Sequence, residues 1–178
     1  MRPAAHWQWF LPGLCVVLAG CTSAVSSYPV DGLTITNLKV GMVCRSNANP
    51  EICSETNDMK ITGEGRCVYN GKSIPCTWYG YSFDYQLAGS STKLQCIATS
   101  SVAVNYGNPK EELKRDAKET RYEIELTRES HHFVNPQYSS AGSGIEGDVH
   151  STQSCAYEGK NVFQFAITLH YPNRQASN

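Results

Sequence analysis

The segment from Thr77 to Leu87 reads Thr-Trp-Tyr-Gly-Tyr-Ser-Phe-Asp-Tyr-Gln-Leu and limits what this chain can fold into more than any other stretch. Its large apolar residues recur at every second position, which matches the side-chain period of a β-strand and differs from the 3.6-residue period of a helix. One face therefore carries rings at positions 79, 81, 83 and 85 and a leucine at 87. A strand with such a face has to be covered by a second layer. We expect this aromatic face to form the core of a layered β protein.

Alternation of apolar and polar residues also marks residues 32–44, 92–104, 121–127 and 162–171. In the first of these segments the phase changes near Asn37, which predicts a β-bulge. In the last, one face collects Phe163, Phe165, Ile167, Leu169 and Tyr171. Short strands separated by turn-forming residues are typical of antiparallel sandwiches and barrels. We expect an all-β fold, a single antiparallel β-sandwich of immunoglobulin or transthyretin-like type with about seven to nine strands.

Two stretches interrupt this pattern. Residues 110–129 hold 13 of the chain's 31 formal charges, which predicts a solvated face. At its start, Asn108 followed by Pro109 favours a short helix that ends near Ala117. Residues 130–153 have no clear period and contain three glycines, at positions 142, 144 and 147, which predicts a loose connection between strands. The alternative for its first part is that His131 to Tyr138 extends the preceding strand and buries Phe133.

The residues Leu18-Ala19-Gly20-Cys21 end an apolar run that begins at Phe10. The run has about ten residues, as in the h-region of a signal peptide, and is too short to span a bilayer. The four residues resemble the lipobox of bacterial lipoproteins, in which an apolar residue and two small ones precede an obligatory cysteine. The alternative is an ordinary secretory signal that is cut a few residues later, for instance after Ala24.

The lipobox resemblance implies that the Cys21 sulfur receives a diacylglycerol, that the chain is cut before it, and that the freed amine is acylated. Two or more acyl chains anchor a protein stably. Thr22 stands where an aspartate would retain an enterobacterial-type lipoprotein at the inner membrane, which implies release to the outer membrane. We therefore expect a signal peptide over residues 1–20, a lipidated tether over 21–31, the sandwich over 32–172 and a polar tail over 173–178.

Six cysteines remain after Cys15 in the signal and the lipidated Cys21 are set aside. An even number in an oxidising compartment predicts three disulfides, whereas a metal site would favour closely spaced pairs such as C-x2-C. The six are Cys44, Cys53, Cys67, Cys76, Cys96 and Cys155.

The Cys67–Cys76 pair is the best determined of the three. Asn70-Gly71 between these cysteines is a strong signal for a two-residue hairpin turn, which would place Cys67 opposite Ile74 and Cys76 on a diagonal from Cys67. That diagonal is slightly too long for a relaxed bridge, so we expect a bulge at Pro75 to close it, with Trp78 beside the bridge. A second short loop, Cys44 to Cys53, is rich in turn formers, and Cys96 with Cys155 then remains.

The sequence offers little that indicates catalysis. It contains no G-x-S-x-G, no H-E-x-x-H and no phosphate-binding glycine loop. A zinc or copper site built from His131 or His132 with Asp148 and His150 is conceivable, but the spacing fits no ligand pattern and adjacent side chains on a strand point apart. His170 is expected on the polar face of the last strand, without a role. We expect no enzyme activity, no cofactor and no bound metal.

Without residues 1–20 the chain has 158 residues, enough for one domain, and 14 basic against 16 acidic residues, a net charge of −2. That balance argues against a nucleic-acid partner. We expect a lipoprotein on the periplasmic face of the bacterial outer membrane that binds or scaffolds an envelope protein assembly of the secretion, pilus or conjugation type. The alternative is a periplasmic inhibitor of a hydrolase such as a lysozyme or protease. Partner binding is expected at the glycine-rich segment 139–147, framed by Tyr138 and Ile145.

Overall fold

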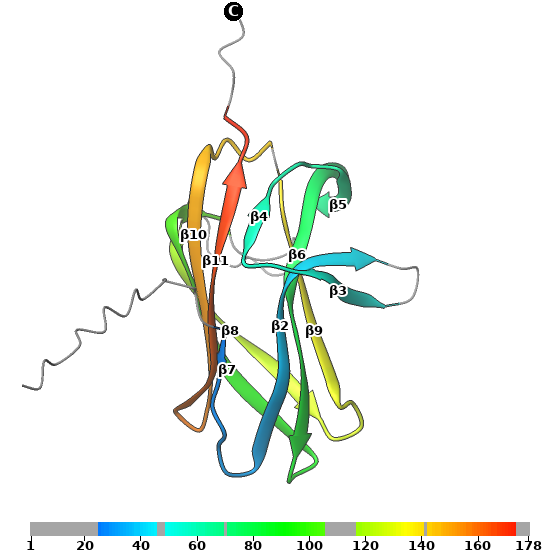
Figure 1. Cartoon of the computed structure of the whole chain (residues 1–178), viewed down its shortest axis with the longest axis vertical. Coiled ribbons are helices and arrows are strands. Elements are labelled where there is room, and N and C mark those ends of the chain that lie inside the picture. Colours follow the sequence, from blue (N-terminus) through cyan, green and yellow to red (C-terminus); the bar gives the residue numbers. More distant parts are fainter. Residues whose placement is uncertain (1–24, 46–48, 70, 106–116, 141, 174–178) are drawn as a thin grey trace, which may run out of the picture.

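The computed structural model describes residues 25–45, 49–69, 71–105, 117–140 and 142–173 (Figure 1). Its strands are β1 (Ser26–Ser27), β2 (Leu33–Arg45), β3 (Pro50–Glu55), β4 (Asp58–Lys60), β5 (Gly65–Tyr69), β6 (Lys72–Leu87), β7 (Ser91–Val104), β8 (Ala117–Thr127), β9 (His132–Ser139), β10 (Gly147–Tyr157) and β11 (Lys160–Tyr171). Of the predicted helix after Pro109, only Ala117 lies within the described residues, where it begins β8. No helix in these ranges is long and apolar enough to cross a membrane.

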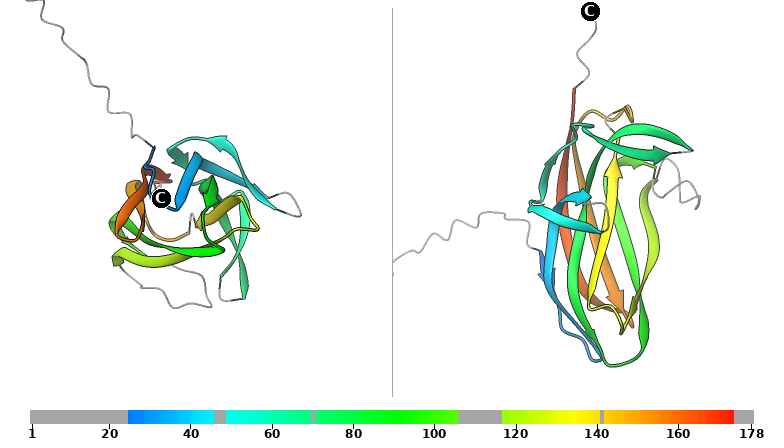
Figure 2. Two further views of the ribbon diagram at one scale, coloured as in Figure 1. Left: turned by 90° about the horizontal axis from the view of Figure 1, so that it is seen from below. Right: turned by 90° about the vertical axis from the view of Figure 1, so that its right-hand side faces the viewer.

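The strands form two facing sheets (Figures 1 and 2). The first sheet has the order β1-β11-β10-β7-β8, with β4 paired to β11; the second has the order β3-β2-β6-β5, with β9 paired to β6. Pairing is antiparallel except between β4 and β11, which run parallel. The protein is therefore an all-β antiparallel sandwich, as the sequence predicts. The described residues contain eleven strands where seven to nine were expected, because β1 and β4 add short edge segments and β9 is a strand of its own, not an extension of the preceding one.

The expectation of a loose connection over residues 130–153 is wrong for most of that stretch. His132–Ser139 is β9, which pairs with β6 from Thr77 to Asp84, and β10 begins at Gly147. The pattern misled because most of β9 is half-buried and carries polar side chains that hydrogen-bond inside the sandwich. Among the described residues of this stretch, only Ser130, His131 and the connection between Ser139 and Gly147 lie outside strands.

Aromatic rings from both sheets meet in the core. Tyr81 and Phe83 of β6 are fully buried, and the Tyr81 ring lies 5.5 Å from the ring of Phe163 and 5.2 Å from that of Phe165, centroid to centroid, on β11. Burial of each such ring stabilises the fold by roughly 2 kcal/mol or more. The predicted core face of β6 is confirmed at positions 81, 83 and 85, whereas Tyr79 at its other end is only half-buried. The predicted inner face of β11 is buried throughout.

The bulge predicted near Asn37 is also confirmed. The register of β2 against β6 shifts between Thr36 and Lys39, and Asn37 has a φ of 51°. Asparagine tolerates this left-handed conformation better than most residues. Its side-chain amide donates a hydrogen bond of 2.7 Å to the Asp84 carboxylate on β6, which fixes the bulge to the neighbouring strand.

A buried polar chain also joins the two sheets. The hydroxyls of Tyr81 and Tyr122 lie 3.1 Å apart, and the Tyr122 hydroxyl donates to the Gln153 side-chain oxygen at 2.9 Å. On the other side Asn135 donates to the Tyr81 hydroxyl at 2.9 Å, and Gln137 exchanges two amide hydrogen bonds with Gln153. Burial raises the pKa of Tyr122 far above its usual value, so this hydroxyl stays protonated. The chain couples β9 to β8 and β10 across the sandwich.

The predicted tether is partly built into the fold. Ser26 and Ser27 pair with Gln164 and Phe163 at the edge of the first sheet, and the Tyr28 amide donates to the Val162 carbonyl at 2.8 Å. Within the expected tether, the stretch from Ser26 to Tyr28 is therefore bonded to β11. Cys21 itself lies outside the described residues.

Candidate functional site

Two disulfide-closed hairpins project from the second sheet on the same side of the molecule (Figure 1). The β2–β3 hairpin is closed by Cys44–Cys53 and the β5–β6 hairpin by Cys67–Cys76. We call them the stapled hairpins. Each bridge joins neighbouring strands over nine residues of sequence, which restricts the strand ends and favours a rigid projection.

The β5–β6 hairpin has the register that its sequence predicts. Tyr69 pairs with Lys72 and Cys67 with Ile74, around a turn in which Gly71 has a φ of 73°. The expected bulge at Pro75 is wrong: Pro75 pairs regularly with Arg66. The two bridged Cα atoms are 5.9 Å apart, within the ordinary range for a disulfide. The strong twist of a two-stranded ribbon brings this diagonal pair together without an extra residue.

An aromatic pair lies behind this hairpin. The rings of Trp78 on β6 and Tyr138 on β9 meet edge to face, with centroids 5.3 Å apart. The Trp78 indole N–H donates to the Arg66 carbonyl at 3.2 Å, and a side chain added at Gly65 would touch both the indole and the Cys76 sulfur. Trp78 thus flanks the bridge, as expected. This edge-to-face contact holds the hairpin against β9 of the sandwich.

Near this hairpin, one large apolar side chain is exposed to solvent and one buried hydroxyl has no hydrogen-bond partner among the described residues. Val68 of β5 is 64% exposed, more than any other large hydrophobic residue described. The Tyr138 hydroxyl is buried and has no hydrogen-bond partner among the described residues, and its burial raises the pKa of Tyr138. Buried polar atoms in native proteins nearly always have a partner, so such an atom calls for an explanation. The outward face of the β5–β6 hairpin, which carries Val68, is the candidate binding surface, and Trp78 with Tyr138 of β9 supports the hairpin from its other face.

The predicted partner-binding residues Tyr138 and Ile145 are both half-buried. Ile145 packs against the hydrophobic core, and Ser139, at the start of the same segment, is buried with its hydroxyl hydrogen-bonded to that of Tyr171. Replacing the whole of residues 139–147 would therefore remove contacts with the core. Only the exposed residues 142–144 fit a freely replaceable loop.

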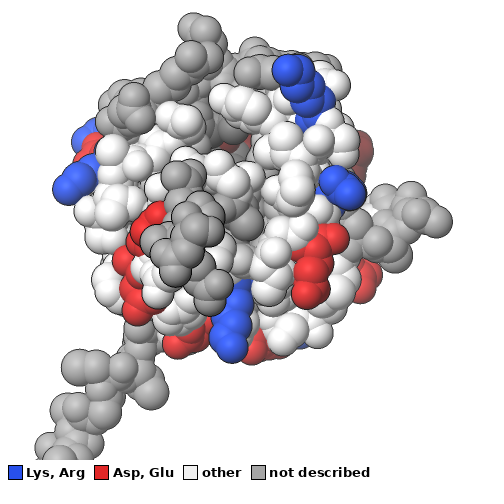
Figure 3. Space-filling model, turned by 90° about the horizontal axis from the view of Figure 1, so that it is seen from above, with Lys and Arg blue, Asp and Glu red and all other residues white. Residues whose placement is uncertain are grey.

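The end of the sandwich that carries this loop is shown from above in Figure 3. Basic and acidic side chains are spread around its rim between uncharged residues. A surface with charges of both signs fits a polar contact with another protein better than a contact that depends on charges of one sign.

The third disulfide joins Cys96 on β7 to Cys155 on β10, two residues directly opposite each other in the first sheet. Both are buried, and their Cα atoms are 4.1 Å apart. The three predicted disulfide pairs are therefore all present. This bridge stabilises the interior and does not contribute to the candidate binding surface.

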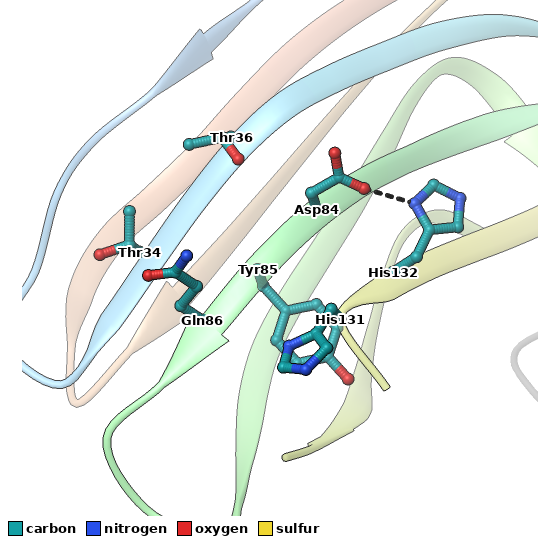
Figure 4. Close-up of a pocket in the computed structure, with 7 residues that line it drawn as sticks. All are labelled: Thr34, Thr36, Asp84, Tyr85, Gln86, His131 and His132. Carbon is teal, nitrogen blue, oxygen red and sulfur yellow. Dashed lines mark hydrogen bonds and ion pairs between the residues drawn. The ribbon is translucent and has the colours of Figure 1, made fainter. Parts of the chain in front are cut away.

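A shallow pocket of about 390 Å³ lies on the second sheet where β2, β6 and β9 run side by side (Figure 4). At its edge the His132 ring nitrogen Nδ1 lies 2.7 Å from the Asp84 carboxylate, which also accepts from Asn37. These hydrogen bonds hold the pKa of Asp84 below its usual value. The other lining residues are Thr34, Thr36, Tyr85, Gln86 and His131. The pocket is polar, and its carboxylate is already paired within the protein.

The histidines considered for a metal site are divided between the two sheets. His132 is on β9 of the second sheet, whereas His150 and Asp148 are on β10 of the first. His150 contacts the Thr168 hydroxyl at 3.2 Å. Among the described residues no group of three or more His, Cys, Asp or Glu side chains is arranged to hold a metal ion.

His170, which was given no role from the sequence, joins three strands. Its Nδ1 lies 2.6 Å from the Asp148 carboxylate on β10, and its Nε2 contacts the Asp58 carboxylate on β4. Both contacts raise the pKa of His170. Asp58 is 112 residues away in sequence, so no local signal could have revealed the pair. Protonated His170 fastens β4 to the edge of the first sheet.

Sequence reasoning missed the exposure of Val68, although a signal was available. In a hairpin whose Cys67 points inward, the next residue must point outward. A valine there is an apolar side chain on the solvent face of a projecting hairpin, which the alternation alone would have flagged.

No family model matches the chain, and no curated protein matches it. A crystal structure of an immunoglobulin-like protein from Pseudomonas aeruginosa is similar over 85% of this chain and 100% of that one, with 10% sequence identity and a TM-score of 0.45.

Proposed function

We propose that this protein is a lipoprotein, anchored through Cys21 to the periplasmic face of the bacterial outer membrane, that binds or scaffolds an envelope protein assembly of the secretion, pilus or conjugation type. It acts by binding and not by catalysis. The lipobox resemblance supports the anchor, and the three disulfides suit an oxidising compartment.

The observation that carries the binding role is the candidate binding surface. A rigid hairpin presents Val68 to solvent on its outward face, and the Trp78–Tyr138 pair supports the same hairpin from its other face. Binding energy at protein interfaces concentrates in a few aromatic or apolar anchors on preorganised elements, because such elements lose little conformational entropy on association.

The test is site-specific cross-linking in living cells. A photoactivatable amino acid replaces Val68, and in a matched control it replaces Glu125, which is exposed on the outer face of the first sheet. We expect the position-68 protein to capture one or more envelope proteins, identified by mass spectrometry, and the control to capture none of them. Capture of the same proteins at position 125 alone would place the binding surface elsewhere. Capture at neither position would contradict the assembly proposal.

A hydrolase inhibitor is the second candidate, and one feature favours it. The β5–β6 hairpin is closed by a buried disulfide and carries its most exposed apolar residue between the bridge and the turn. A rigid projection of this kind can occupy the cleft of an enzyme. The purified domain would then reduce the activity of a lysozyme or protease in a dose-dependent way, and Val68→Asp would weaken the inhibition. Unchanged hydrolase activity at saturating protein would contradict this candidate.

A further inference from the structure

The first described residues leave apolar side chains in solvent. Among the described residues, the exposed large hydrophobics are Val25 at 42%, Tyr28 at 41% and Val68 at 64%. Single exposed apolar residues are ordinary on protein surfaces. Two of the three, however, lie three positions apart in sequence, directly before and after β1.

The position of these two residues is fixed by the fold. Ser26 and Ser27 are paired with β11, and the Tyr28 amide is bonded to Val162, so Val25 and Tyr28 are held at the edge of the first sheet. The stapled hairpins lie on the opposite side of the molecule (Figures 1 and 2). The edge formed by β1 and β11 and the candidate binding surface therefore face different directions.

The distance to the proposed lipid is short. Val25 follows Cys21 by four positions and Tyr28 follows it by seven. An extended chain spans at most about 14 Å over the first length and about 25 Å over the second. The interfacial region of a bilayer leaflet is several ångströms deep on either side of the headgroup level. A cysteine held by acyl chains would keep Val25 and Tyr28 within reach of that region at all times.

The chemistry of the two side chains fits this location. Tyrosine is enriched at membrane interfaces, where its ring contacts the acyl boundary and its hydroxyl stays among the headgroups. Valine gains free energy when its apolar surface leaves water. The partner that suits an apolar pair next to a lipid anchor is the lipid itself.

We propose that Val25 and Tyr28 insert into the interface of the phospholipid leaflet that holds the Cys21 acyl chains, so that the edge formed by β1 and β11 faces the membrane and the stapled hairpins face the periplasm. This inference rests on the proposed lipid anchor. It adds an orientation to that anchor, because a lipidated cysteine on a free tether would leave the sandwich able to turn in any direction.

Tryptophan fluorescence tests the insertion. After removal of residues 1–20, Trp78 is the single tryptophan of the chain. Acylated wild-type protein, Tyr28→Trp and the matched control Val68→Trp are incorporated into vesicles of phosphatidylethanolamine and phosphatidylglycerol with brominated acyl chains. We expect the added emission of Tyr28→Trp to fall by about half or more, since the bromines quench at the shallow depth of an interfacial residue. Wild-type and Val68→Trp emission should match that in unbrominated vesicles.

Mass spectrometry of each preparation separates this inference from the anchor. Unquenched Tyr28→Trp in protein whose mass includes the acyl chains would overturn the insertion and leave the anchor standing. Equal quenching at positions 28 and 68 would overturn the orientation. A mature chain without acyl mass would contradict both proposals. Circular dichroism identical to wild type confirms that the exposed substitutions leave the sandwich folded.

Discussion

Gly80 is a position where a single added methyl group should destabilise the fold strongly. It lies in the middle of β6, paired with Pro136 of β9, and it is buried. A Cβ atom at this position would lie 2.1 Å from the carbonyl oxygen of Asn135. Because that atom belongs to the backbone of the neighbouring strand, no side-chain rotation can relieve the overlap.

The cost of Gly80→Ala follows from this contact. β9 would have to move by close to an ångström, which costs about 1–3 kcal/mol for overpacking and roughly 1 kcal/mol for each weakened strand hydrogen bond. The alanine also lowers the entropy of the unfolded chain, which offsets about 0.4–1 kcal/mol of this loss in the free energy of unfolding. The net loss is about 2–3 kcal/mol, equivalent to a fall in Tm of roughly 5–10 °C for a domain of this size.

The assay is thermal and urea unfolding of the oxidised domain, followed by circular dichroism. The matched control is Gly89→Ala, since a Cβ at Gly89 would meet no atom within 4 Å and Gly89 does not adopt a positive φ. The control should melt at or slightly above the wild-type temperature. If Gly80→Ala melts within about 1 °C of the control, a deviation well below the shift expected from overpacking, then β9 does not pack against β6 as described.

Three further outcomes are expected. Cys21→Ser should accumulate as an uncut precursor and leave the lipid-modified membrane pool, seen by mass spectrometry and fractionation; an unchanged mature mass would contradict the lipobox. A non-reduced digest should contain a peptide pair joined by Cys67 and Cys76, and alkylation of the denatured, unreduced domain should label neither. Because its two aspartate partners raise the folded-state pKa of His170, its stabilising contribution is complete below about pH 6.5 and is lost as pH rises through the raised value. His170→Gln should flatten that decline in urea unfolding at pH 6 to 8.5, and an unchanged slope would show that the contacts are not made.

Local patterns predicted the parts of the fold that local physics determines. The turn signal Asn70-Gly71 set the register of the β5–β6 hairpin, and the cysteine spacing then selected the Cys67–Cys76 bridge. The change of phase near Asn37 located a bulge to within a residue or two. In each case the cause lies within a few residues of its effect.

The parts that were missed depend on contacts between distant segments. β9 carries Asn135 and Gln137 on half-buried positions, and these amides are tolerated only because Tyr81 and Gln153 supply hydrogen bonds from other strands. The prediction of a bulge at Pro75 was wrong because it did not take into account the strong twist of a two-stranded ribbon. The exposure of Val68 could be predicted from alternation, whereas the contact between Trp78 and Tyr138 depends on the register of β9 against β6.

The three disulfides have a consequence for how the two layers are joined. Each one connects strands of the same sheet: β2 with β3, β5 with β6, and β7 with β10. Within the described residues, the covalent links between the layers are therefore only the backbone connections that cross from one sheet to the other. A protease that cut all of these crossings would leave no covalent bond between the layers, so fragments from different sheets would come apart in denaturant without any reductant. The disulfides thus restrain strands within each sheet. Aromatic packing and the hydrogen bonds of buried hydroxyl and amide groups hold the two sheets together.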